Sequence, residues 1–383
     1  MARYRWTILA LGTGAQTAYS AVFLGIPVLA PALQHEYDLD LTQVGLAIAA
    51  ANGGSIFTLL AWGLLADRVG ERSVLGAGLA GCAAGLLVAA FAPSFAVLVL
   101  ALAVAGAAGA SVNAASGRAV MSWFGRDQRG FALGIRQTAL PIGGLLAALV
   151  LPPVAAAGGV RAGLTVLAAG CLAAAIAGAS GLREAPHGEE EELKDIGHPM
   201  RDPRMWRLSI GSGFVLAAQI SILSFLILFL HQERGLSTAA AAGVFAVIQA
   251  LGAVLRIVSG RWSDRVHARI APLRRLALAL AATLAAAAVL LSAPLVILIP
   301  VFVAAGALSL SWNGLSFTAA AELAGRARAG AALGFQQTAL AITSAAAPPA
   351  FAVVVESGSW SLAYGLAAAM PIVGIAVMRQ LSL

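Results

Sequence analysis

Charged residues are scarce in this chain, and their scarcity excludes most classes of soluble protein. Asp, Glu, Lys and Arg make up 11% of the 383 residues, whereas 60% are hydrophobic. Soluble globular chains average about 25% charged and about 45–50% apolar residues. The formal net charge of +7 does not indicate nucleic-acid binding, because the 24 basic residues are scattered through short linkers between apolar runs. The sequence therefore predicts an integral membrane protein. Its expected partner is the lipid bilayer, and no binding of nucleic acid is expected.

Cysteine and histidine are few as well. The two cysteines, Cys82 and Cys171, and the five histidines are too scattered for a disulfide scaffold or a zinc site. The apolar runs also lack the HExxH, GxSxG and paired-aspartate patterns of intramembrane enzymes. We therefore expect no metal, no cofactor and no enzymatic activity. The same absences, together with the lack of an extramembrane ligand domain, disfavour a receptor.

Long apolar runs fill the rest of the chain. A helix needs roughly 20 apolar residues to cross about 30 Å of hydrocarbon, and charges or clusters of Pro, Gly and Ser divide the runs into twelve segments of that length. The predicted membrane spans are 6–30, 42–66, 73–92, 95–122, 131–156, 161–181, 206–231, 238–260, 275–292, 295–321, 330–354 and 360–378. The first run is too long for a signal-peptide core and is kept as a span.

Arginine and lysine gather in every second linker. By the positive-inside rule these linkers and both termini are expected to be cytoplasmic, in a bacterial inner membrane. The longest linker, 182–205, carries the acidic run Glu189–Glu192 and is expected to be a solvated cytoplasmic tether. It separates two predicted six-helix halves, 1–181 and 206–383.

The two halves are related by an internal repeat at an offset of 200 residues. Ser111–Leu140 and Ser311–Leu340 are identical at 14 of 30 positions, including Asn113/Asn313 and Ser116/Ser316. An alanine-rich chain would match Ala and Leu by chance, but not Asn, Gln, Thr and Arg together. Spans 4 and 5 thus recur as spans 10 and 11 in the same orientation, which indicates a parallel duplication.

A short motif follows the second span of each half. GLLADRVGER runs from Gly63 to Arg72, and GRWSDRVHAR begins at Gly260. The first is similar to the fingerprint GxLaDrxGxrr of the major facilitator superfamily, and the twelve spans in a 6+6 repeat extend the resemblance over the whole chain. The resemblance implies an all-α integral membrane fold of two pseudo-symmetric six-helix halves, and transport by alternating access. We expect a monomer.

The resemblance also implies that the two motif copies are conformational latches and not substrate ligands. Gly63 would permit a close helix contact, while Asp67 would cap a neighbouring helix and pair with Arg118. The other expected latch residues are Arg68, Arg72, Asp264 and Arg265.

Two arginines lie inside predicted spans. Arg256 lies roughly 12 Å along its helix from Asp264, and Arg136 roughly 9 Å from Gly130. Charges at such depth are costly and are usually functional, although for Arg136 a snorkelling or latch role is the alternative. None of the 17 acidic residues lies deep in a predicted span. Two buried guanidiniums without carboxylates predict an anionic ligand, and the planar fork suits a carboxylate or an oxyanion.

The segment from Arg256 to Asp264, RIVSGRWSD, is similar to the span-8 arginine motif shared by oxalate/formate exchangers, monocarboxylate carriers and nitrate/nitrite porters. That resemblance implies that Arg256 contacts the substrate. The exchangers' span-11 lysine is replaced here by Gln336, whereas the repeat-related place in span 5 holds Arg136. The porters' span-2 arginine is absent because Leu59 occupies its place. We therefore expect an organic mono- or dicarboxylate, with nitrate or nitrite as an alternative.

Neutral polar residues inside the spans complete the candidate substrate site. They are Gln16, Tyr19, Asn113, Gln219, Gln249, Trp312, Asn313 and Gln336. For each of them, an interhelical hydrogen bond is the alternative to a substrate contact.

A multidrug exporter driven by proton antiport is the alternative class of transporter. The segment Ala139–Gly144 resembles the span-5 antiporter motif ending GPxxGG, with Leu140 in place of the first glycine. Exporters of cationic drugs usually need acids embedded in the membrane, and the predicted spans hold none at depth. Proton symport would likewise need a protonatable group there. We therefore expect anion exchange, with residues 1–181 rocking against 206–383, while the identity of the anion and the direction of transport stay open.

Overall fold

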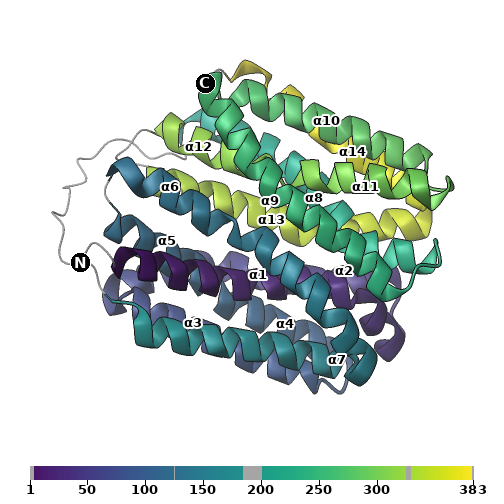
Figure 1. Cartoon of the computed structure of the whole chain (residues 1–383), viewed down its shortest axis with the longest axis horizontal. Helices are drawn as coiled ribbons and strands as arrows, with labels where there is room; N and C mark the ends of the chain where they lie inside the picture. The colour runs from purple at the N-terminus through teal and green to yellow at the C-terminus, as the bar shows by residue number, and fades with distance from the viewer. Residues whose placement is uncertain (1–3, 125, 184–200, 325–328, 382–383) are drawn as a thin grey trace. The chain divides into compact units, whose positions relative to one another are not determined.

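The computed structural model describes residues 4–124, 126–183, 201–324 and 329–381, and every long element in them is an α-helix (Figure 1). Most of the predicted tether 182–205 lies outside these ranges, as do Gly325, Arg326 and Arg328. The chain forms two compact units: unit 1 is Met1–Leu39 with Leu46–Glu191, and unit 2 is Asp40–Gly45 with Glu192–Leu383.

Unit 1 is built from seven helices in the described ranges, α2 having its first turn in unit 2. They are α1 (Tyr4–Tyr37), α2 (Leu41–Val69), α3 (Glu71–Ala90), α4 (Phe95–Gly109), α5 (Ser111–Trp123), α6 (Arg126–Gln137) and α7 (Ala139–Gly181). Unit 2 contains α8 (Pro203–Gln232), α9 (Thr238–Arg265), α10 (Ile270–Val289), α11 (Leu295–Ser309), α12 (Asn313–Ala324), α13 (Ala329–Ser357) and α14 (Trp360–Val377), which ends in a 3₁₀ turn, η3 (Met378–Gln380).

Ten helical stretches of the described residues are long and apolar enough to cross a membrane. Two features account for the difference from the twelve predicted spans. The 29-residue helix α2 is not among the ten, and α7 joins most of the fifth predicted span, whose first residues are on α6, to the sixth in one long element. Within α7 the backbone leaves the helical conformation at Gly158 and Gly159, and Gly159 has a φ of 65°, which a residue without Cβ adopts most readily.

Two other predicted spans are broken helices. The span 95–122 is divided into α4 and α5 at Ala110, and the span 295–321 into α11 and α12 at residues 310–312. Neither break contains a proline or a glycine. Each break leaves the last carbonyl groups of its first helix without the usual partner four residues on, so other side chains must satisfy them.

Small residues allow the helices of unit 1 to approach closely. A Cβ on Gly143 of α7 would lie 2.6 Å from the carbonyl oxygen of Thr17 in α1, and one on Gly106 of α4 would lie 1.9 Å from that of Ala51 in α2. Because backbone atoms cannot move aside, these positions require glycine. The contact between α1 and α7 is the most extensive of unit 1, and it fixes the helix that carries Gln16.

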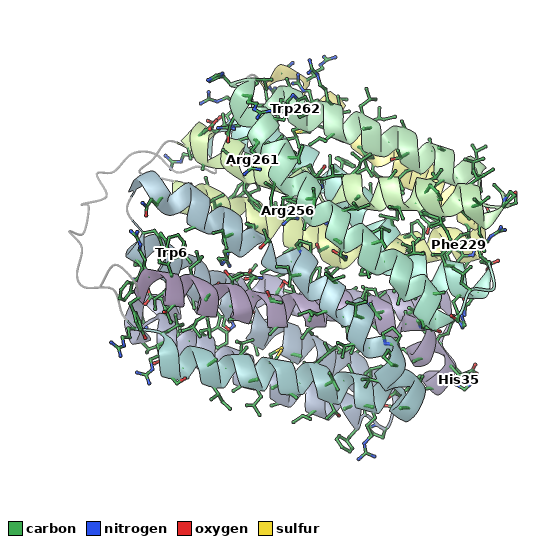
Figure 2. The ribbon with its side chains drawn as sticks, viewed as in Figure 1. Trp6, His35, Phe229, Arg256, Arg261 and Trp262 are labelled. Atoms are coloured by element: carbon green, nitrogen blue, oxygen red, sulfur yellow. The ribbon has the colours of Figure 1, made fainter. Side chains whose placement is uncertain are left out.

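Aromatic side chains pack one end of unit 2. The rings belong to Phe225, Phe229, Phe302, Phe351, Trp360 and Tyr364. Phe225 stacks on Phe351 with ring centroids 5.3 Å apart. Such pairs stabilise beyond the area that they bury. Figure 2 shows Phe229 at this end of unit 2, with Arg261 and Trp262 at the opposite end and Arg256 between them.

Candidate functional site

Arg136 is buried in unit 1 among neutral oxygen atoms. Its side chain is on α6 and is 5% exposed. Its Nε donates to Ser116 Oγ at 2.8 Å, and its Nη2 donates to Gln16 Oε1 at 2.9 Å and to the Asn113 carbonyl oxygen at 3.3 Å. Residues of α1 and α5 thus hold the guanidinium, and the snorkelling alternative does not fit this burial. Neutral acceptors fix its orientation without neutralising its charge.

Arg256 is buried in unit 2 beside the break between α11 and α12. It is 8% exposed, its Nε donates to the Leu310 carbonyl oxygen at 3.1 Å, and its Nη2 donates to Asn313 Oδ1 at 3.1 Å. Ser259, one turn further along α9, donates to the Ser311 carbonyl oxygen at 2.7 Å. Side chains of α9 therefore satisfy two carbonyl groups that the break exposes, and the break in turn positions the guanidinium.

Unit 1 has a comparable arrangement without an arginine. Thr58 Oγ1 and Trp62 Nε1, both on α2, donate to the Ala107 carbonyl oxygen at 2.7 Å each, just before the break between α4 and α5. The internal repeat therefore extends to the way in which the second helix of each half supports a broken helix. Among the described donors, those at the break of unit 1 are neutral, whereas the break of unit 2 has the charged Arg256.

The repeat-related partner of Arg136 occupies an equivalent place. Gln336 of α13 donates from Nε2 to Ser316 Oγ at 2.5 Å, as Arg136 donates to Ser116. Ser316 is also hydrogen-bonded to Ser212 at 2.6 Å. The position equivalent to Ser212 in unit 1 is Gly12, which packs on Ser116. The same cradle thus holds a cation in unit 1 and a neutral amide in unit 2.

Of the remaining predicted site residues, Tyr19, Gln219 and Gln249 are on helices, and Trp312 lies in the break between α11 and α12. Tyr19 donates its hydroxyl to the Gly106 carbonyl oxygen at 3.2 Å, and Trp312 donates Nε1 to Gln219 Oε1 at 3.0 Å. These three side chains therefore make the interhelical hydrogen bonds that were the alternative to substrate contacts. Gln249 is fully buried on α9, and neither atom of its amide has a hydrogen-bond partner among the described residues.

Two of the residues expected to form latches, Arg118 and Asp264, make ion pairs at helix ends. In unit 1, Arg118 Nε lies 3.0 Å from Glu71 Oε1; the side chain of Asp67 lies outside the described part of the structure. A Cβ on Gly63 would meet no described atom within 4 Å, so the close helix contact expected there stays a prediction. Arg72 Nε donates to the Ala179 carbonyl oxygen, and Arg68 is exposed.

In unit 2, Arg269 takes the central place in a network of three charges. It contacts Asp264 at 2.5 Å and Glu322 at 2.9 Å, whereas Arg265 is exposed. Burial lowers the pKa of Arg269, but hydrogen bonds to the two carboxylates raise it more, so that the net shift is upward. The pair Arg269–Glu322 links the region before α10 to α12, as Glu71–Arg118 links α3 to α5, with the positions of acid and base exchanged.

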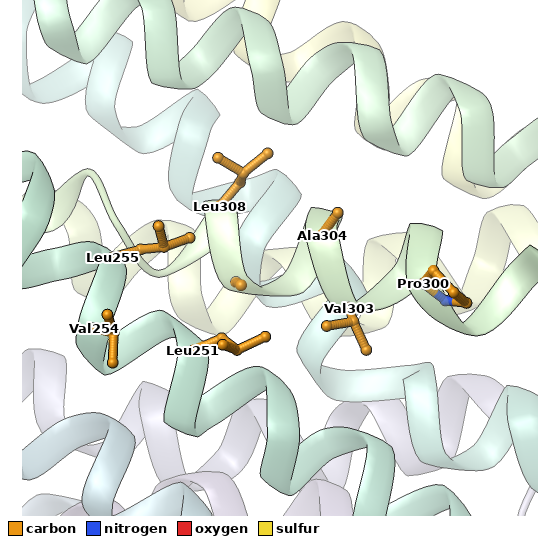
Figure 3. Close-up of a pocket in the computed structure, with 8 residues that line it drawn as sticks. Leu251, Val254, Leu255, Pro300, Val303, Ala304 and Leu308 are labelled. Atoms are coloured by element: carbon orange, nitrogen blue, oxygen red, sulfur yellow. The ribbon is translucent and has the colours of Figure 1, made fainter.

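A groove of about 440 Å³ lies between α9 and α11 (Figure 3). Its walls are the apolar residues Leu251, Val254, Leu255, Pro300, Val303, Ala304, Ala307 and Leu308. Leu251 and Val254 are exposed, whereas Arg256 is buried. The groove offers no partner for an anion and is not the site predicted from the sequence.

Three serines of these clusters were not among the predicted site residues. Ser116, Ser316 and Ser259 each fix a side chain or carbonyl group of the arginine clusters. The identity Ser116/Ser316 within the repeat was the available signal for two of them. Ser259 offered none, because serine is common in membrane helices and its partner is a backbone atom 52 residues away.

The chain belongs to the Major Facilitator Superfamily, whose family model matches residues 11–348. The resemblance seen in GLLADRVGER is therefore confirmed. The chain is a multi-pass membrane transporter and not an enzyme.

Relatives within the family support a transport role. An uncharacterized MFS-type transporter of Mycobacterium tuberculosis is 35% identical over 378 residues, which cover 97% of this chain and 84% of that protein. A probable sulfoacetate transporter of Cupriavidus necator is 26% identical, with 92% and 87% covered. A probable nitrate/nitrite antiporter of Thermus thermophilus is 30% identical, with 69% and 62% covered.

The fold is shared with a solved transporter structure. A bacterial homolog of the human lysosomal transporter Spinster, in an inward-facing and occupied conformation, superposes with a TM-score of 0.83. The match covers 98% of this chain and 96% of that one at 16% sequence identity. The prediction of the superfamily fold is thus confirmed.

Proposed function

We propose that the chain carries a small organic anion, a mono- or dicarboxylate, across the bacterial inner membrane, with both termini cytoplasmic. The observation that carries the proposal is the burial of Arg136 with three neutral oxygen atoms as its hydrogen-bond acceptors. A buried guanidinium in such a cradle keeps a charge that a mobile anion can neutralise. Arg256, the motif arginine, is the principal ligand in this proposal, and Arg136 is the second.

The acids near these arginines support an anion over a cationic drug. Asp264 is the single acidic residue of α9, lies two turns from Arg256, and is engaged by Arg269. Glu71 is likewise engaged by Arg118. The described residues that contact Arg136 or Arg256 include no carboxylate that could bind a cationic drug. The relatives described as sulfoacetate and nitrate/nitrite transporters also carry anions, and the absence of a span-2 arginine favours an organic anion over nitrate.

Replacement of Arg256 by lysine tests the principal ligand. Arg256→Lys keeps a positive charge but loses the planar fork that binds a carboxylate through two parallel hydrogen bonds. Uptake of labelled carboxylates into proteoliposomes should fall about tenfold or more in kcat/KM. The matched control is Arg261→Lys, an exposed arginine near the end of the same helix, which should keep near wild-type uptake.

Because Arg256 also supports the break between α11 and α12, the binding of the carboxylate must be measured separately from the folding of the protein. A carboxylate that binds the folded protein raises its Tm. The ligand-free Arg256→Lys protein should unfold cooperatively but lose this ligand-induced rise. Near wild-type uptake in Arg256→Ala, at equal expression, would overturn the assignment.

A further inference from the structure

Gln336 carries a buried acceptor atom without a partner. Its side chain is fully buried, its Nε2 donates to Ser316, and its Oε1 has no hydrogen-bond partner among the described residues. A buried amide oxygen in that condition is destabilising, and native structures usually satisfy such atoms with protein, water or a ligand. The unpaired acceptor is specific to unit 2, because Arg136, which holds the equivalent place in unit 1, has no acceptor atom.

The unpaired oxygen belongs to the same cluster as Arg256. Arg256 donates to Asn313 Oδ1, and Gln336 donates to Ser316 Oγ. Asn313 and Ser316 are three residues apart on α12, so they lie on adjacent turns of one face, separated by a rise of roughly 4.5 Å. The side chains that Arg256 and Gln336 contact are thus one turn apart on α12, a separation that a ligand of a few heavy atoms can span.

A second unpaired amide lies on the face of Arg256. Gln249 precedes Arg256 by seven residues on α9, which places both on one stripe of the helix. It is fully buried, and both Oε1 and Nε2 lack partners in the described structure. Unit 2 thus contains a buried cation together with two buried amides. Three atoms of these amides, Gln249 Oε1, Gln249 Nε2 and Gln336 Oε1, have no hydrogen-bond partner among the described residues.

An amide oxygen repels a carboxylate but accepts a hydrogen bond from a hydroxyl or an N–H group. We propose that the transported anion carries a neutral hydrogen-bond donor beside its carboxylate, and that Gln336 Oε1 accepts that donor while Arg256 binds the carboxylate. The proposal rests on the proposed function. It narrows the substrate class to hydroxy acids and N-acylated amino acids, and it makes Gln336 a specificity-determining residue.

Matched pairs of acids that differ by one donor test this proposal. Suitable pairs are glycolate and acetate, lactate and propionate, malate and succinate, and N-acetylglycine and levulinate, in which a CH₂ replaces the N–H. The purified full chain is titrated with each acid, and its Tm is recorded. For at least one pair the acid with the donor should bind about tenfold or more tightly than its partner, because a site built for a donor rejects the analogue that lacks it.

Substitution of Gln336 then assigns the preference to a residue. Gln336→Leu should reduce the ratio of affinities within that pair to about twofold or less, since the acceptor is lost. The matched control is Gln337→Leu, the same substitution on the next residue of α13, which should keep the wild-type ratio.

The outcomes separate this inference from the proposed function. If no acid of either kind raises the Tm of the wild-type protein or competes for uptake, the proposed function fails. If acids bind but those with a donor bind no more tightly in any pair, the inference is overturned and the proposed function stands. The same result is expected if a water molecule, and not the substrate, donates to Gln336 Oε1. An unchanged ratio in Gln336→Leu overturns the role of Gln336.

Discussion

Arg136 and Gln336 hold equivalent places in the repeat, and the structure shows that a glutamine fits this place, since Gln336 donates to Ser316 as Arg136 does to Ser116. Arg136→Gln should therefore fold and keep a Tm near that of the wild type. Removal of one positive charge should weaken dicarboxylates roughly tenfold and monocarboxylates less. KM values for both classes in proteoliposomes measure the effect, and equal losses would leave Arg136 with a structural or gating role.

At the same scale, the sequence predicted the side chains that carry charge better than those that orient them. Arg136 and Arg256 were evident because a charge within an apolar run is costly and rare. Ser116 and Ser259 became candidates only through their contacts, because a small hydroxyl causes no break in hydropathy. Asn113 was predicted for its side chain, whereas it is its backbone carbonyl oxygen that accepts from Arg136.

At the scale of the helix, the break between α11 and α12 depends on side chains of α9. Ser259→Ala removes the donor to the Ser311 carbonyl oxygen and leaves that buried group unsatisfied. We expect the free energy of unfolding to fall by about 1–3 kcal/mol, observed as a lower Tm in detergent. Ser180→Ala is the matched control, because Ser180 is exposed and bonds only within its own helix, and it should leave the Tm nearly unchanged. Equal Tm values for the two variants would contradict the role given to Ser259.

The helix breaks also mark the limit of prediction from hydropathy. The apolar runs correctly placed the long helices, but a run has the same hydropathy whether its helix is continuous or broken. Gly109 directly precedes the break at Ala110, but many glycines of this chain lie within continuous helices, and residues 310–312 contain neither proline nor glycine. What allows them is the set of donors on other helices, at Thr58, Trp62 and Arg256. Such long-range compensation cannot be predicted from local sequence.

For the whole molecule, the scarcity of deep acids bears on energy coupling. An empty carrier must reorient with buried arginines that no carboxylate within the predicted spans can neutralise, and their desolvation is costly. A bound anion offsets that cost, so the loaded form should reorient faster than the empty one. In proteoliposomes, unlabelled substrate inside should accelerate uptake of labelled substrate severalfold, with little effect of a pH gradient alone. Concentrative uptake into substrate-free vesicles, driven by an inward proton gradient and abolished by an uncoupler, would refute exchange.

The close packing of α1 against α7 has a consequence for biosynthesis. α1 ends at Tyr37, and its partner ends about 140 residues later at Gly181. At about 5–20 residues per second, the ribosome needs roughly 7–30 s to supply that partner. During this interval the face of α1 that packs on Gly143 of α7, at Thr17, Ser20 and Ala21, lacks its partner helix. We therefore expect a holding step at the translocation channel until α7 emerges, and we expect a truncation before α7 to be degraded even though its six preceding helices have been made.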